Sequence, residues 1–597
     1  MRPPCPTVQR ALDLLTSGRP EQGEPILRRH LQRQPGDATG NHIMAAVLLQ
    51  LGRADQASFF ASRANAFCPG DFAILSVLGT ALMGCERVPE AITALESAAR
   101  LAPNDPAVLN TLGVALTQAN RLPEAVLHLR RSLEIKPRAP QTIENLVAAL
   151  VRLGDNNATR ELLGRAIELW PGHEPFRLAW STQVLYDSGV SAAEIRAAHE
   201  HLARLIEARS TPLPTPAPRG DARRPLRVGF ISPDFRRHSV SWFVEPILAA
   251  LADEGARRGL DIELACYQSC GADAVTAKLR AYGHPWVDAT AMTDRAAAER
   301  IRADGVDVLI DLAGHSAHNR LGVLALRPAP VQMTYLGYPA TTGLNACEFR
   351  IVDSLTDPPG AEDQCSERLL RLDPCFLCYR PPRPLPALPE RPPSAAGGGV
   401  TFGSFNSILK LSDACAGLWA RLLHAVPASR LLLKQRGLEH APARERLGAL
   451  LARHGVSADR LEFLPLQPDL NEHLSTYGRV DIALDSLPYN GTTTTCEALI
   501  MGVPVLTLTG ATHAARVGTS VLHAAGAPEL VARDADAFVA LGAALAADAP
   551  RLAAYRRDLR ERMLASVLCD EPGFASRFAR CVRGAVEESG SNPRPRS

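Results

Sequence analysis

Long apolar runs and a large excess of one charge are both missing from this sequence. No stretch of about 18 or more consecutive apolar residues occurs, so no membrane-spanning helix is predicted. The first ten residues, MRPPCPTVQR, lack the apolar core of a signal peptide. The formal net charge is +2, which is too small to steer a chain of 597 residues to nucleic acid. These absences predict a cytoplasmic protein that binds neither membrane nor nucleic acid.

Metal-binding and common nucleotide-binding patterns are missing as well. The 13 cysteines are scattered, and the one compact pair, Cys375 and Cys378, is followed by neither a second pair nor histidines at ligand spacing. We therefore expect buried free thiols rather than a metal or redox site. The chain contains no G-x-G-x-x-G or Walker A motif, which argues against the usual dinucleotide and P-loop sites.

Lysine is the scarcest charged residue. Only four of the 65 Lys and Arg residues are lysine, at positions 136, 278, 410 and 434. Arginine stays charged in proteins, whereas lysine is a compact point charge whose pKa burial can tune. A lysine that persists in so arginine-rich a chain is therefore a candidate for a chemical role.

The first third of the chain repeats every 34 residues. Prolines stand at positions 35, 69, 103, 137 and 171, and Leu78-Gly79 recurs as Leu112-Gly113. Proline ends a helix, and small residues at fixed positions let two antiparallel helices approach closely. The period is typical of tetratricopeptide repeats. It predicts that residues from about 4 to 205 form a right-handed helical solenoid of roughly five repeats. Its concave face would bind extended segments of other proteins, although a spacer or a dimerisation arm is the alternative.

Short apolar runs alternate with helical patterns in the rest of the chain. After a proline-rich linker at 211–225, strands are predicted at 226–232, 261–267, 306–314, 331–337, 430–434, 460–466, 480–486 and 503–510. Buried strands that alternate with helices form parallel sheets. The proline- and glycine-rich stretch 380–399 divides the set, so two doubly wound domains that face a cleft are predicted. Ligands of such domains bind outside the carboxyl ends of the strands.

The stretch PYNGTTTTCEALIMG joins two of the predicted strands. Asn490 and Gly491 form a turn there. We expect Thr494 to be the N-cap of a short helix, with Glu497 as its capping-box partner, and Gly502 to end the helix.

The start of this helix predicts a phosphate site. Free backbone N–H groups carry positive partial charge there, and the hydroxyls of Thr492, Thr493 and Thr494 add donors beside them. The simpler interpretation is that one threonine caps the helix and the others are neutral filler. Glu497 could belong only to the cap, or it could accept hydrogen bonds from ribose hydroxyls.

Together these features resemble the O-linked N-acetylglucosamine transferase family in its bacterial form. The resemblance covers essentially the whole chain and is carried by FISPDFRRHSVSWF (230–243), LALRPAPVQMTYLGYPATTG (324–343), FGSFNSILK (402–410), NEHL (471–474), LDSLPYNGTTTTCEALIMGVPVLTL (484–508) and HAARVG (513–518). It implies a tetratricopeptide-repeat α-solenoid followed by a catalytic region of two Rossmann-like domains, which is known as the GT-B fold. It also implies an inverting, metal-independent transfer of a sugar, first of all N-acetylglucosamine, from a UDP-sugar to Ser or Thr hydroxyls of proteins.

The resemblance also implies a domain plan and a set of partners. The expected parts are a solenoid at 1–205, a linker at 206–225, an N-terminal Rossmann-like catalytic domain at 226–390, a C-terminal UDP-binding domain at 391–548, helices packing back on the catalytic region at 549–587 and a disordered tail at 588–597. The UDP-sugar is the donor substrate, and no cofactor or metal is expected. Acceptor proteins would bind through the solenoid, and a homodimer is a further expectation.

Two catalytic residues follow from the resemblance. Lys410 stands where the family places its phosphate-binding lysine, opposite the helix that starts near Thr492. His238 matches an active-site histidine near the acceptor and the sugar. It could act as the general base, or it could position sugar or acceptor without taking a proton. Lys434 ends a strand without motif support and is interpreted as structural.

The resemblance assigns a wider set to the UDP-sugar: Asn406, Ser407, His473, Asn490, Gly491, Thr492, Thr493, Thr494 and Glu497. His473, in NEHL, matches a family histidine near the uracil, and a capping role on the following helix is the alternative. Asn406 and Ser407 lie in the loop before Lys410.

Several positions depart from the animal enzymes of the family. Ser407 replaces a glutamine, Thr492 replaces a histidine, and a second active-site histidine falls on Asp307. His315 and His318 could compensate, although helix capping or surface exposure explains them equally well. These departures leave the donated sugar and the identity of the base open.

Other functions remain compatible with the sequence. The chain could use UDP-glucose, attack asparagine, or transfer sugar to a polysaccharide or a lipid, of which lipid is disfavoured because no basic amphipathic helix is evident. It could also be a binding scaffold with an inactive transferase half. The intact Lys410, His238 and threonine run argue against the scaffold.

Overall fold

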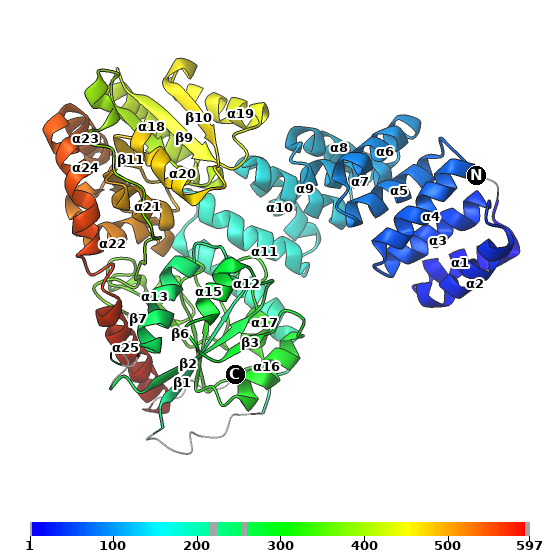
Figure 1. Ribbon diagram of the computed structural model, residues 1–597, viewed down its shortest axis with the longest axis horizontal. Helices are drawn as coiled ribbons and strands as arrows, with labels where there is room; N and C mark the ends of the chain where they lie inside the picture. Colours follow the sequence, from blue (N-terminus) through cyan, green and yellow to red (C-terminus); the bar gives the residue numbers. More distant parts are fainter. Residues whose placement is uncertain (1–2, 215–223, 254, 256–258, 592–597) are drawn as a thin grey trace. The chain divides into compact units, whose positions relative to one another are not determined.

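The computed structural model describes residues 3–214, 224–253, 255 and 259–591, and it divides between Leu169 and Trp170 into two compact units (Figure 1). The first unit is an array of antiparallel helix pairs. Its helices are α1 (Pro6–Thr16), α2 (Pro20–Arg33), α3 (Ala38–Gln50), α4 (Ala54–Phe67), α5 (Phe72–Gly84), α6 (Val88–Leu101), α7 (Pro106–Gln118), α8 (Leu122–Ile135), α9 (Pro140–Leu153) and α10 (Asn156–Leu169).

The local chemistry of the repeats explains these helix ends. Each repeat proline follows the second helix of a pair by two residues, as Pro69 follows α4, so the predicted helix ends are confirmed. The next helix is then capped, as when Asp71 accepts hydrogen bonds from the first turn of α5. A Cβ at Gly79 would lie 2.4 Å from Leu95 Cγ, so only glycine lets α5 and α6 approach this closely.

The second unit begins with three helical elements that the sequence analysis assigned to the solenoid. They are α11 (Glu174–Gln183), the 3₁₀ turn η1 (Val184–Tyr186) and α12 (Ala192–Ala208). Ser191 and Glu194 form a capping box at the start of α12. The far end of α12 is tied to the first α/β domain, because the Asn345 N–H donates to Glu207 at 2.7 Å. These helices therefore belong structurally to the α/β unit.

The first α/β domain is built on a seven-stranded sheet with the order β3-β2-β1-β4-β5-β6-β7, and all its paired strands are parallel. Its strands are β1 (Leu226–Ser232), β2 (Ile262–Gln268), β3 (Trp286–Asp288), β4 (Val308–Asp311), β5 (Val331–Thr334), β6 (Phe349–Val352) and β7 (Arg368–Arg371). Its helices are α13 (Ser241–Ala252), α15 (Ala274–Arg280), α16 (Asp294–Ala303), α17 (Leu321–Ala325) and η2 (Ala361–Gln364).

The second α/β domain is built on a six-stranded parallel sheet with the order β10-β9-β8-β11-β12-β13. Its strands are β8 (Thr401–Ser404), β9 (Arg430–Gln435), β10 (Leu461–Pro465), β11 (Ile482–Leu484), β12 (Val505–Leu508) and β13 (Val531–Ala532). Its helical elements are η3 (Pro393–Ala396), η4 (Ile408–Lys410), α18 (Asp413–Ala425), α19 (Ala441–Ala452), η5 (Ala458–Arg460), α20 (Leu470–Ser475), η6 (Thr476–Arg479), α21 (Thr493–Ile500), η7 (His513–Ala515), α22 (Val517–Ala524), η8 (Pro528–Leu530) and α23 (Ala535–Ala547).

All eight predicted strands are present, and the predicted fold class is confirmed. The sequence analysis missed β3, β6, β7, β8 and β13, each of which has four residues or fewer. The equally short β4 and β11 lie within longer apolar runs, whereas Arg350 interrupts β6 and arginines stand at both ends of β7, so no apolar run stands out there.

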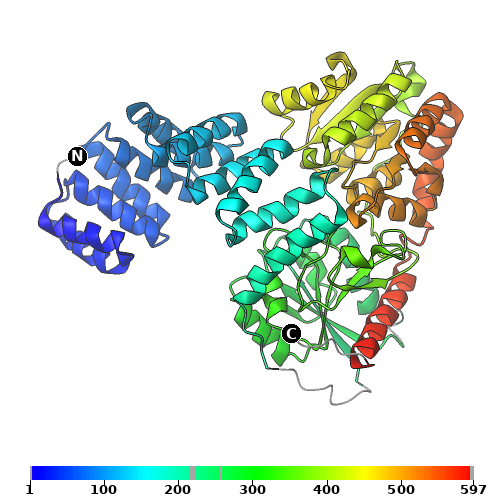
Figure 2. The same ribbon diagram turned by 180° about the vertical axis from the view of Figure 1, so that it is seen from behind.

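Two helices end the described chain, α24 (Ala549–Leu564) and α25 (Glu571–Ser591). α24 packs against α21 and α23 of the second domain, whereas α25 packs against α13, β5 and β7 of the first (Figures 1 and 2). The chain was expected to pack back on the catalytic region from position 549. It reaches the first domain only at α25. α25 also continues into the segment that was expected to be a disordered tail, and residues 592–597 lie outside the described part of the chain.

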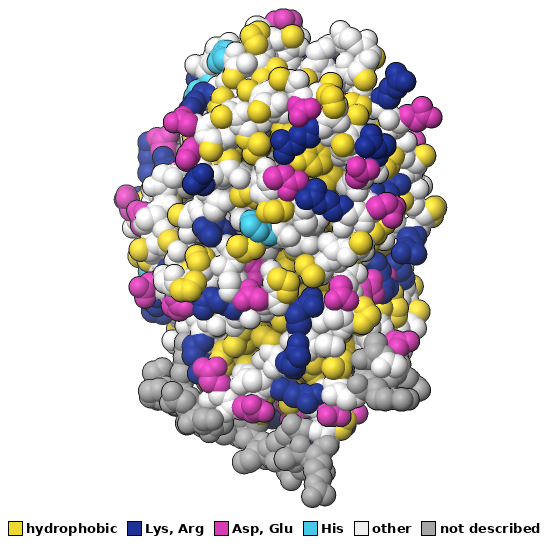
Figure 3. Space-filling model, turned by 90° about the vertical axis from the view of Figure 1, so that its left-hand side faces the viewer, with side chains coloured by type: hydrophobic (Ala, Val, Ile, Leu, Met, Phe, Trp, Pro, Cys, Tyr) yellow, Lys and Arg dark blue, Asp and Glu magenta, His cyan; other side chains and the backbone are white. Residues whose placement is uncertain are grey.

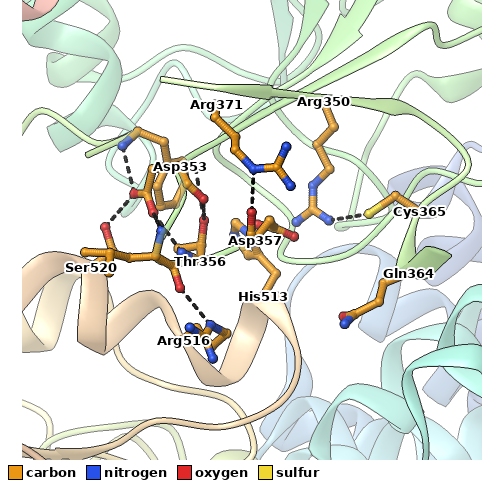
Figure 4. A network of polar contacts seen from close by, with 12 residues as sticks. Arg350, Asp353, Thr356, Asp357, Gln364, Cys365, Arg371, His513, Arg516 and Ser520 are labelled. Carbon is orange, nitrogen blue, oxygen red and sulfur yellow. Dashed lines mark hydrogen bonds and ion pairs between the residues drawn. The ribbon is translucent and has the colours of Figure 1, made fainter. Parts of the chain in front are cut away.

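A buried polar junction joins the two α/β domains (Figure 4). His513 of the second domain meets Asp357 of the first with an Nδ1–Oδ2 distance of 2.5 Å, and both side chains are buried. Ser520 Oγ donates to Asp353 Oδ2 at 2.5 Å, and Arg516 Nε donates to the Leu355 carbonyl oxygen at 2.7 Å. Because buried polar groups are costly to separate, these contacts fix the two domains against each other at this edge.

The face of the molecule shown in Figure 3 carries Lys and Arg side chains interspersed with Asp and Glu. No field of one sign gathers on the described residues of this face, which agrees with the small net charge. Among the described residues, no single helix has both the length and the apolar character to cross a membrane. The pair α23 and α24 passes that test of length and composition only when taken together, and it is bent by 92°.

Candidate active site

Two loops meet at the carboxyl end of the second sheet. β8 and β11 are parallel neighbours, so the loops that follow them leave the same edge. Lys410, in the first loop, donates a hydrogen bond from Nζ to the Asn490 carbonyl oxygen at 2.7 Å. Asn406, also in the first loop, accepts from the Thr494 hydroxyl at 2.9 Å. The structure therefore brings together residues that lie 80 and 88 positions apart in the sequence.

The second loop is braced from inside. The buried carboxylate of Asp485 accepts from the Gly491 N–H at 2.6 Å and from the Thr507 hydroxyl at 3.0 Å. The Asn490 amide donates to the Ser486 carbonyl oxygen at 2.8 Å. A Cβ at Gly491 would lie 2.6 Å from Asn406 Oδ1, so the two loops touch only because this residue is glycine. The Asn490 side chain and Gly491 therefore shape the loop.

The start of α21 differs from the prediction. The N-cap is Thr492, its side chain makes no capping hydrogen bond, and the expected capping box of Thr494 and Glu497 does not form. The Thr494 hydroxyl is used by Asn406, and the Glu497 carboxylate turns to His473 and Tyr477 instead. The predicted end of the helix is confirmed, because Gly502 follows the C-cap with a left-handed φ of +70°.

Unused hydrogen-bond donors are left at the start of α21. The Thr493 hydroxyl is buried and has no hydrogen-bond partner within the described part of the chain. The adjacent Thr495 hydroxyl, in contrast, donates to the Gly491 carbonyl oxygen at 3.0 Å. The first N–H groups of a helix have no partner inside it and carry positive partial charge. Together with the Thr493 hydroxyl, they make this end of α21 suited to an anion.

Lys410 supplies a full positive charge beside this helix end. Burial lowers the pKa of Lys410 to about 8, while the nearby Asp485 carboxylate acts in the opposite direction. Its Nζ also lies 4.0 Å from the ring centroid of Tyr489. A cation held by an aromatic face and a carbonyl oxygen, with little water around it, interacts strongly with an incoming phosphate.

A second polar cluster borders the same loops. His473, on α20, lies with Nε2 3.1 Å from Glu497 Oε2, and Glu497 also accepts from the Tyr477 hydroxyl at 3.3 Å. Lys434, on β9, donates from its buried Nζ to the His473 carbonyl oxygen at 2.9 Å and lies 4.5 Å from the Phe405 ring centroid. Burial lowers the pKa of Lys434 to about 8.

Lys434, interpreted from the sequence as structural, lies in this cluster and borders the candidate site. The signal that could have found it is its position at the end of a strand next to β8 in the sheet. His473 lies within α20, whose N-cap is Asp469, and the N-cap of the following η6 is Ser475, so His473 caps neither element. Ser407 is exposed, and a small pocket at the strand ends is lined by Asn406, Ser407 and Lys434 among others.

His238 lies on the first domain, in the loop between β1 and α13. Its side chain is 41% exposed, and its Nδ1 lies 3.5 Å from Oδ2 of the buried Asp234. That oxygen has no hydrogen-bond partner among the described residues, and the Val240 N–H also reaches Nδ1 at 3.3 Å. The neighbouring Arg237 donates to the Pro468 carbonyl oxygen, just before the helix that carries His473. The loop of His238 therefore touches the second domain beside the second polar cluster.

Comparison with known proteins adds the family. The model of "Glycosyl transferase family 41" matches residues 193–382 and 393–578. A solved structure of a mutant O-GlcNAc transferase from Thermobaculum terrenum is 32% identical, covers 87% of this chain and 98% of that one, and has a TM-score of 0.77. The chain belongs to glycosyl transferase family 41.

Curated relatives from plants match about 60% of this chain. "Probable UDP-N-acetylglucosamine--peptide N-acetylglucosaminyltransferase SPINDLY" of Arabidopsis thaliana is 42% identical over 361 residues, which is 60% of this chain and 39% of the relative. The corresponding SEC protein of the same plant is 27% identical over 370 residues. This chain thus spans less than two-fifths of the length of the family 41 relatives from plants.

The sequence left open the roles of three residues of the first domain: Asp307, His315 and His318. Asp307 precedes β4, at the opposite edge of the sheet from the carboxyl ends, and binds the Arg224 guanidinium through both oxygens. His315 is buried, with Nε2 2.7 Å from the Thr342 carbonyl oxygen. His318 is exposed and adopts a left-handed φ of +60°. Asp307 thus lies away from the carboxyl ends of the strands, whereas His315 follows β4 at that end.

No group of three or more His, Cys, Asp or Glu side chains in the described ranges is arranged to hold a metal ion. Cys375 and Cys378, the compact pair of the sequence, are both buried free thiols, as predicted.

Proposed function

We propose that this chain transfers a sugar from a UDP-sugar to Ser or Thr hydroxyls of proteins, with inversion at the sugar carbon and without a metal, and that the sugar is N-acetylglucosamine. One observation carries the proposal. The Lys410 ammonium group and the unused donors at the start of α21 converge on one loop at the carboxyl end of a parallel sheet.

Charge on the leaving group is the main demand of this reaction. As the bond between the sugar carbon and the phosphate oxygen breaks, UDP takes the bonding electrons and gains negative charge. Lys410, the first N–H groups of α21 and the Thr493 hydroxyl are fixed before the reaction starts, so they stabilise that charge without reorganising. The same groups would hold the diphosphate of the bound donor.

The acceptor hydroxyl needs a base on the opposite face of the sugar. If Nδ1 of His238 donates to Asp234, its Nε2 keeps a lone pair and can take the hydroxyl proton as the oxygen attacks. If Nδ1 accepts from the Val240 N–H, Nε2 carries the proton and can only position the substrate. We propose the first arrangement, because the unpaired oxygen of Asp234 is buried and points at Nδ1.

The nucleoside would occupy the second polar cluster. We propose that the rings of His473 and Phe405, whose centroids lie 6.2 Å apart, pack near the uracil. Lys434 donates to the His473 carbonyl oxygen, and Glu497 contacts the His473 ring nitrogen, so the two residues hold His473 in place. Glu497 keeps further acceptor capacity, which we assign to the ribose hydroxyls. Asn406 and Ser407 would line the space between nucleoside and phosphate.

The helical solenoid would deliver the acceptor. Its described residues expose several large apolar side chains: Phe59, Phe67, Phe72, Leu101, Leu127, Ile135 and Leu169. Exposed apolar groups on a repeat array are typical of protein-binding surfaces. We propose a cytoplasmic enzyme of the bacterial type, active as a homodimer, and sedimentation equilibrium tests the dimer.

Nucleotide binding tests the donor site. We expect titration calorimetry to show UDP binding in the presence of EDTA, weakened by Lys410→Ala and unchanged by Lys136→Ala, which alters an exposed lysine of the solenoid. GDP and ADP are the comparison nucleotides. Stronger binding of a purine diphosphate would overturn the UDP assignment. Binding that EDTA abolishes and Mg²⁺ restores would overturn the metal-free assignment.

A further inference from the structure

Tyr489 lies immediately before the loop from Asn490 to Thr494, which belongs to the proposed donor site. It connects this loop to helices outside the two α/β domains. Its ring lies 4.0 Å below the Lys410 Nζ. The same ring stacks on Tyr186 of η1, with centroids 5.4 Å apart and planes inclined by 15°. One tyrosine thus contacts both the phosphate-binding lysine and the segment that joins α11 to α12.

The apolar surroundings of Tyr489 are also supplied by these helices. Val184, Leu185, Ile195 and Ala198 form a buried cluster with Ala340 of the first domain, and Trp180, Val190, Tyr338 and Tyr489 pack against it. Burial raises the pKa of Tyr186 to about 12, which keeps its phenol neutral. Tyr489 therefore reaches out of its own domain into an apolar cluster built mainly by residues 180–198.

The base of this cluster is rigidly attached. The buried His199 lies with Nδ1 2.7 Å from the Ile195 carbonyl oxygen, which can only accept, so Nε2 accepts from the Tyr338 hydroxyl at 2.8 Å. A Cβ at Gly343 would lie 2.6 Å from the His199 carbonyl carbon, so α12 and the loop of Gly343 are in direct backbone contact. Since α12 is held so closely, η1 presents Tyr186 from a fixed support.

We propose that Tyr186 is a positioning residue of the donor site: by stacking on Tyr489 it sets the place of Lys410 and of the loop from Asn490 to Thr494 relative to the diphosphate. This inference rests on the proposed function. It makes the helices α11 and α12 part of the transferase itself, in addition to any role they have in leading to the solenoid. Small misplacement of groups that stabilise a transition state reduces rates strongly.

Three substitutions separate stacking from simple packing. Tyr186→Ala removes the ring, Tyr186→Leu keeps apolar volume without a ring, and Tyr186→Phe keeps the ring without the hydroxyl. Val190→Ala is the matched control, because it removes apolar volume from the same cluster and has no ring to stack. We expect Tyr186→Ala and Tyr186→Leu to weaken UDP binding by about tenfold and to lower kcat/KM for the donor by about 10- to 100-fold. Tyr186→Phe and Val190→Ala should stay close to the wild type.

The pH profile gives a second, independent readout. Loss of the Tyr186 ring lets water reach Tyr489 and Lys410, so the pKa of Lys410 rises and the decline of kcat/KM moves to higher pH. Asp485 is the charged group that faces Lys410, and the substitutions leave it unchanged. If the Ala protein does not fold, the Leu protein carries the test.

The outcomes distinguish this inference from the proposed function. A wild-type protein that neither binds UDP nor transfers sugar would overturn both. A wild-type protein that does both, with Tyr186→Ala and Tyr186→Leu indistinguishable from Val190→Ala in UDP affinity and pH profile, would overturn the role of Tyr186 alone. If UDP binding is weakened in Tyr186→Ala and Tyr186→Leu and stays close to the wild type in Tyr186→Phe, the positioning role of Tyr186 is established.

Discussion

The ammonium group of Lys410 lies 2.7 Å from the carbonyl oxygen of Asn490, across a gap of 80 residues in the sequence. This hydrogen bond holds the one cation of the β8 loop against the loop that leads into α21. The carbonyl keeps the ammonium in place in the absence of a nucleotide, and two of its three N–H groups remain for phosphate oxygens. The proposed donor site thus has its lysine held in place before the donor arrives.

Lys410→Ala should lower transfer by about 100- to 1000-fold, because it removes a fixed charge that acts on the leaving UDP. The variant should fold, since it loses one hydrogen bond and one contact with the Tyr489 ring and leaves the apolar core unchanged. Steady-state kinetics and thermal melting measure the two effects. Lys136→Ala is the control, and transfer by Lys410→Ala at the rate of that control would remove Lys410 from the site.

The pH dependence of kcat/KM should show a decline through about pH 8. Burial lowers the pKa of Lys410 to about 8, and the amine must be protonated to stabilise phosphate charge. Bound UDP-sugar favours the charged form, so the same decline should occur at higher pH in kcat than in kcat/KM. A kcat/KM that stays level up to pH 10 would contradict this role for the lysine.

Thr493→Val should weaken UDP binding by about tenfold without destabilising the free protein. The buried Thr493 hydroxyl has no partner in the described chain, so its loss removes a donor meant for a ligand. Thr495→Val is the matched control, because that hydroxyl already donates to the Gly491 carbonyl oxygen. It should lower the stability by about 1 kcal/mol. Equal effects of the two substitutions on UDP affinity would show that Thr493 faces no ligand.

Asp234→Asn should lower kcat by about 10- to 100-fold and leave UDP binding unchanged, because the amide no longer favours the His238 tautomer with a free Nε2. Burial lowers the pKa of His238 and the Asp234 carboxylate opposes this. Removal of the carboxylate lowers that pKa further, so the acidic limb of the profile should move to lower pH. Asp288→Asn, an exposed carboxylate at the same sheet edge, is the control. An unshifted limb with a normal kcat would contradict the assignment of Asp234.

Asp357→Asn should destabilise the junction of the two domains by about 3 kcal/mol, since it leaves buried His513 without its anionic partner. Burial by itself would raise the pKa of Asp357, but its hydrogen bond and charge interaction with His513 and the Arg350 charge outweigh burial and lower that pKa. Burial also lowers the pKa of His513, and the Asp357 carboxylate opposes this, so the hydrogen bond to Nδ1 holds the pair when His513 is neutral. The stability that this carboxylate contributes is therefore present above its ordinary pKa of about 3.9 and is lost as pH falls further. Thermal melts at pH 7 and pH 3 measure this, with exposed Asp536→Asn as control. Asp357→Asn with the melting temperature of the wild type at pH 7 would contradict it.

The sequence alone predicts the architecture and a candidate site because both predictions depend on local patterns. A 34-residue period, eight apolar runs and the stretch from Asn490 to Thr494 are all visible without knowledge of tertiary contacts. Lys410 stood out by the rarity of lysine. Each of these signals comes from residues that are close together along the chain.

The parts that could not be predicted depend on contacts between distant residues. Thr494 is a plausible N-cap by local rules, but its hydroxyl is taken by Asn406, 88 residues away. Lys434 lies beside the candidate site because β9 neighbours β8, which follows from the strand order and not from its own neighbours in the sequence. Tyr186 and Tyr489 are more than 300 positions apart, so no local pattern joins them.

The most direct test of the account is transfer of label from UDP-N-acetylglucosamine, with UDP-glucose in parallel, into the proteins of a lysate in EDTA. We predict that label appears in protein and that alkali releases it, as expected of Ser and Thr linkages. We also predict that the Lys410→Ala variant produces no such label. Label that resists alkali would point to asparagine. If the enzyme binds UDP but transfers label from neither donor to the lysate proteins, protein glycosylation with these sugars is contradicted.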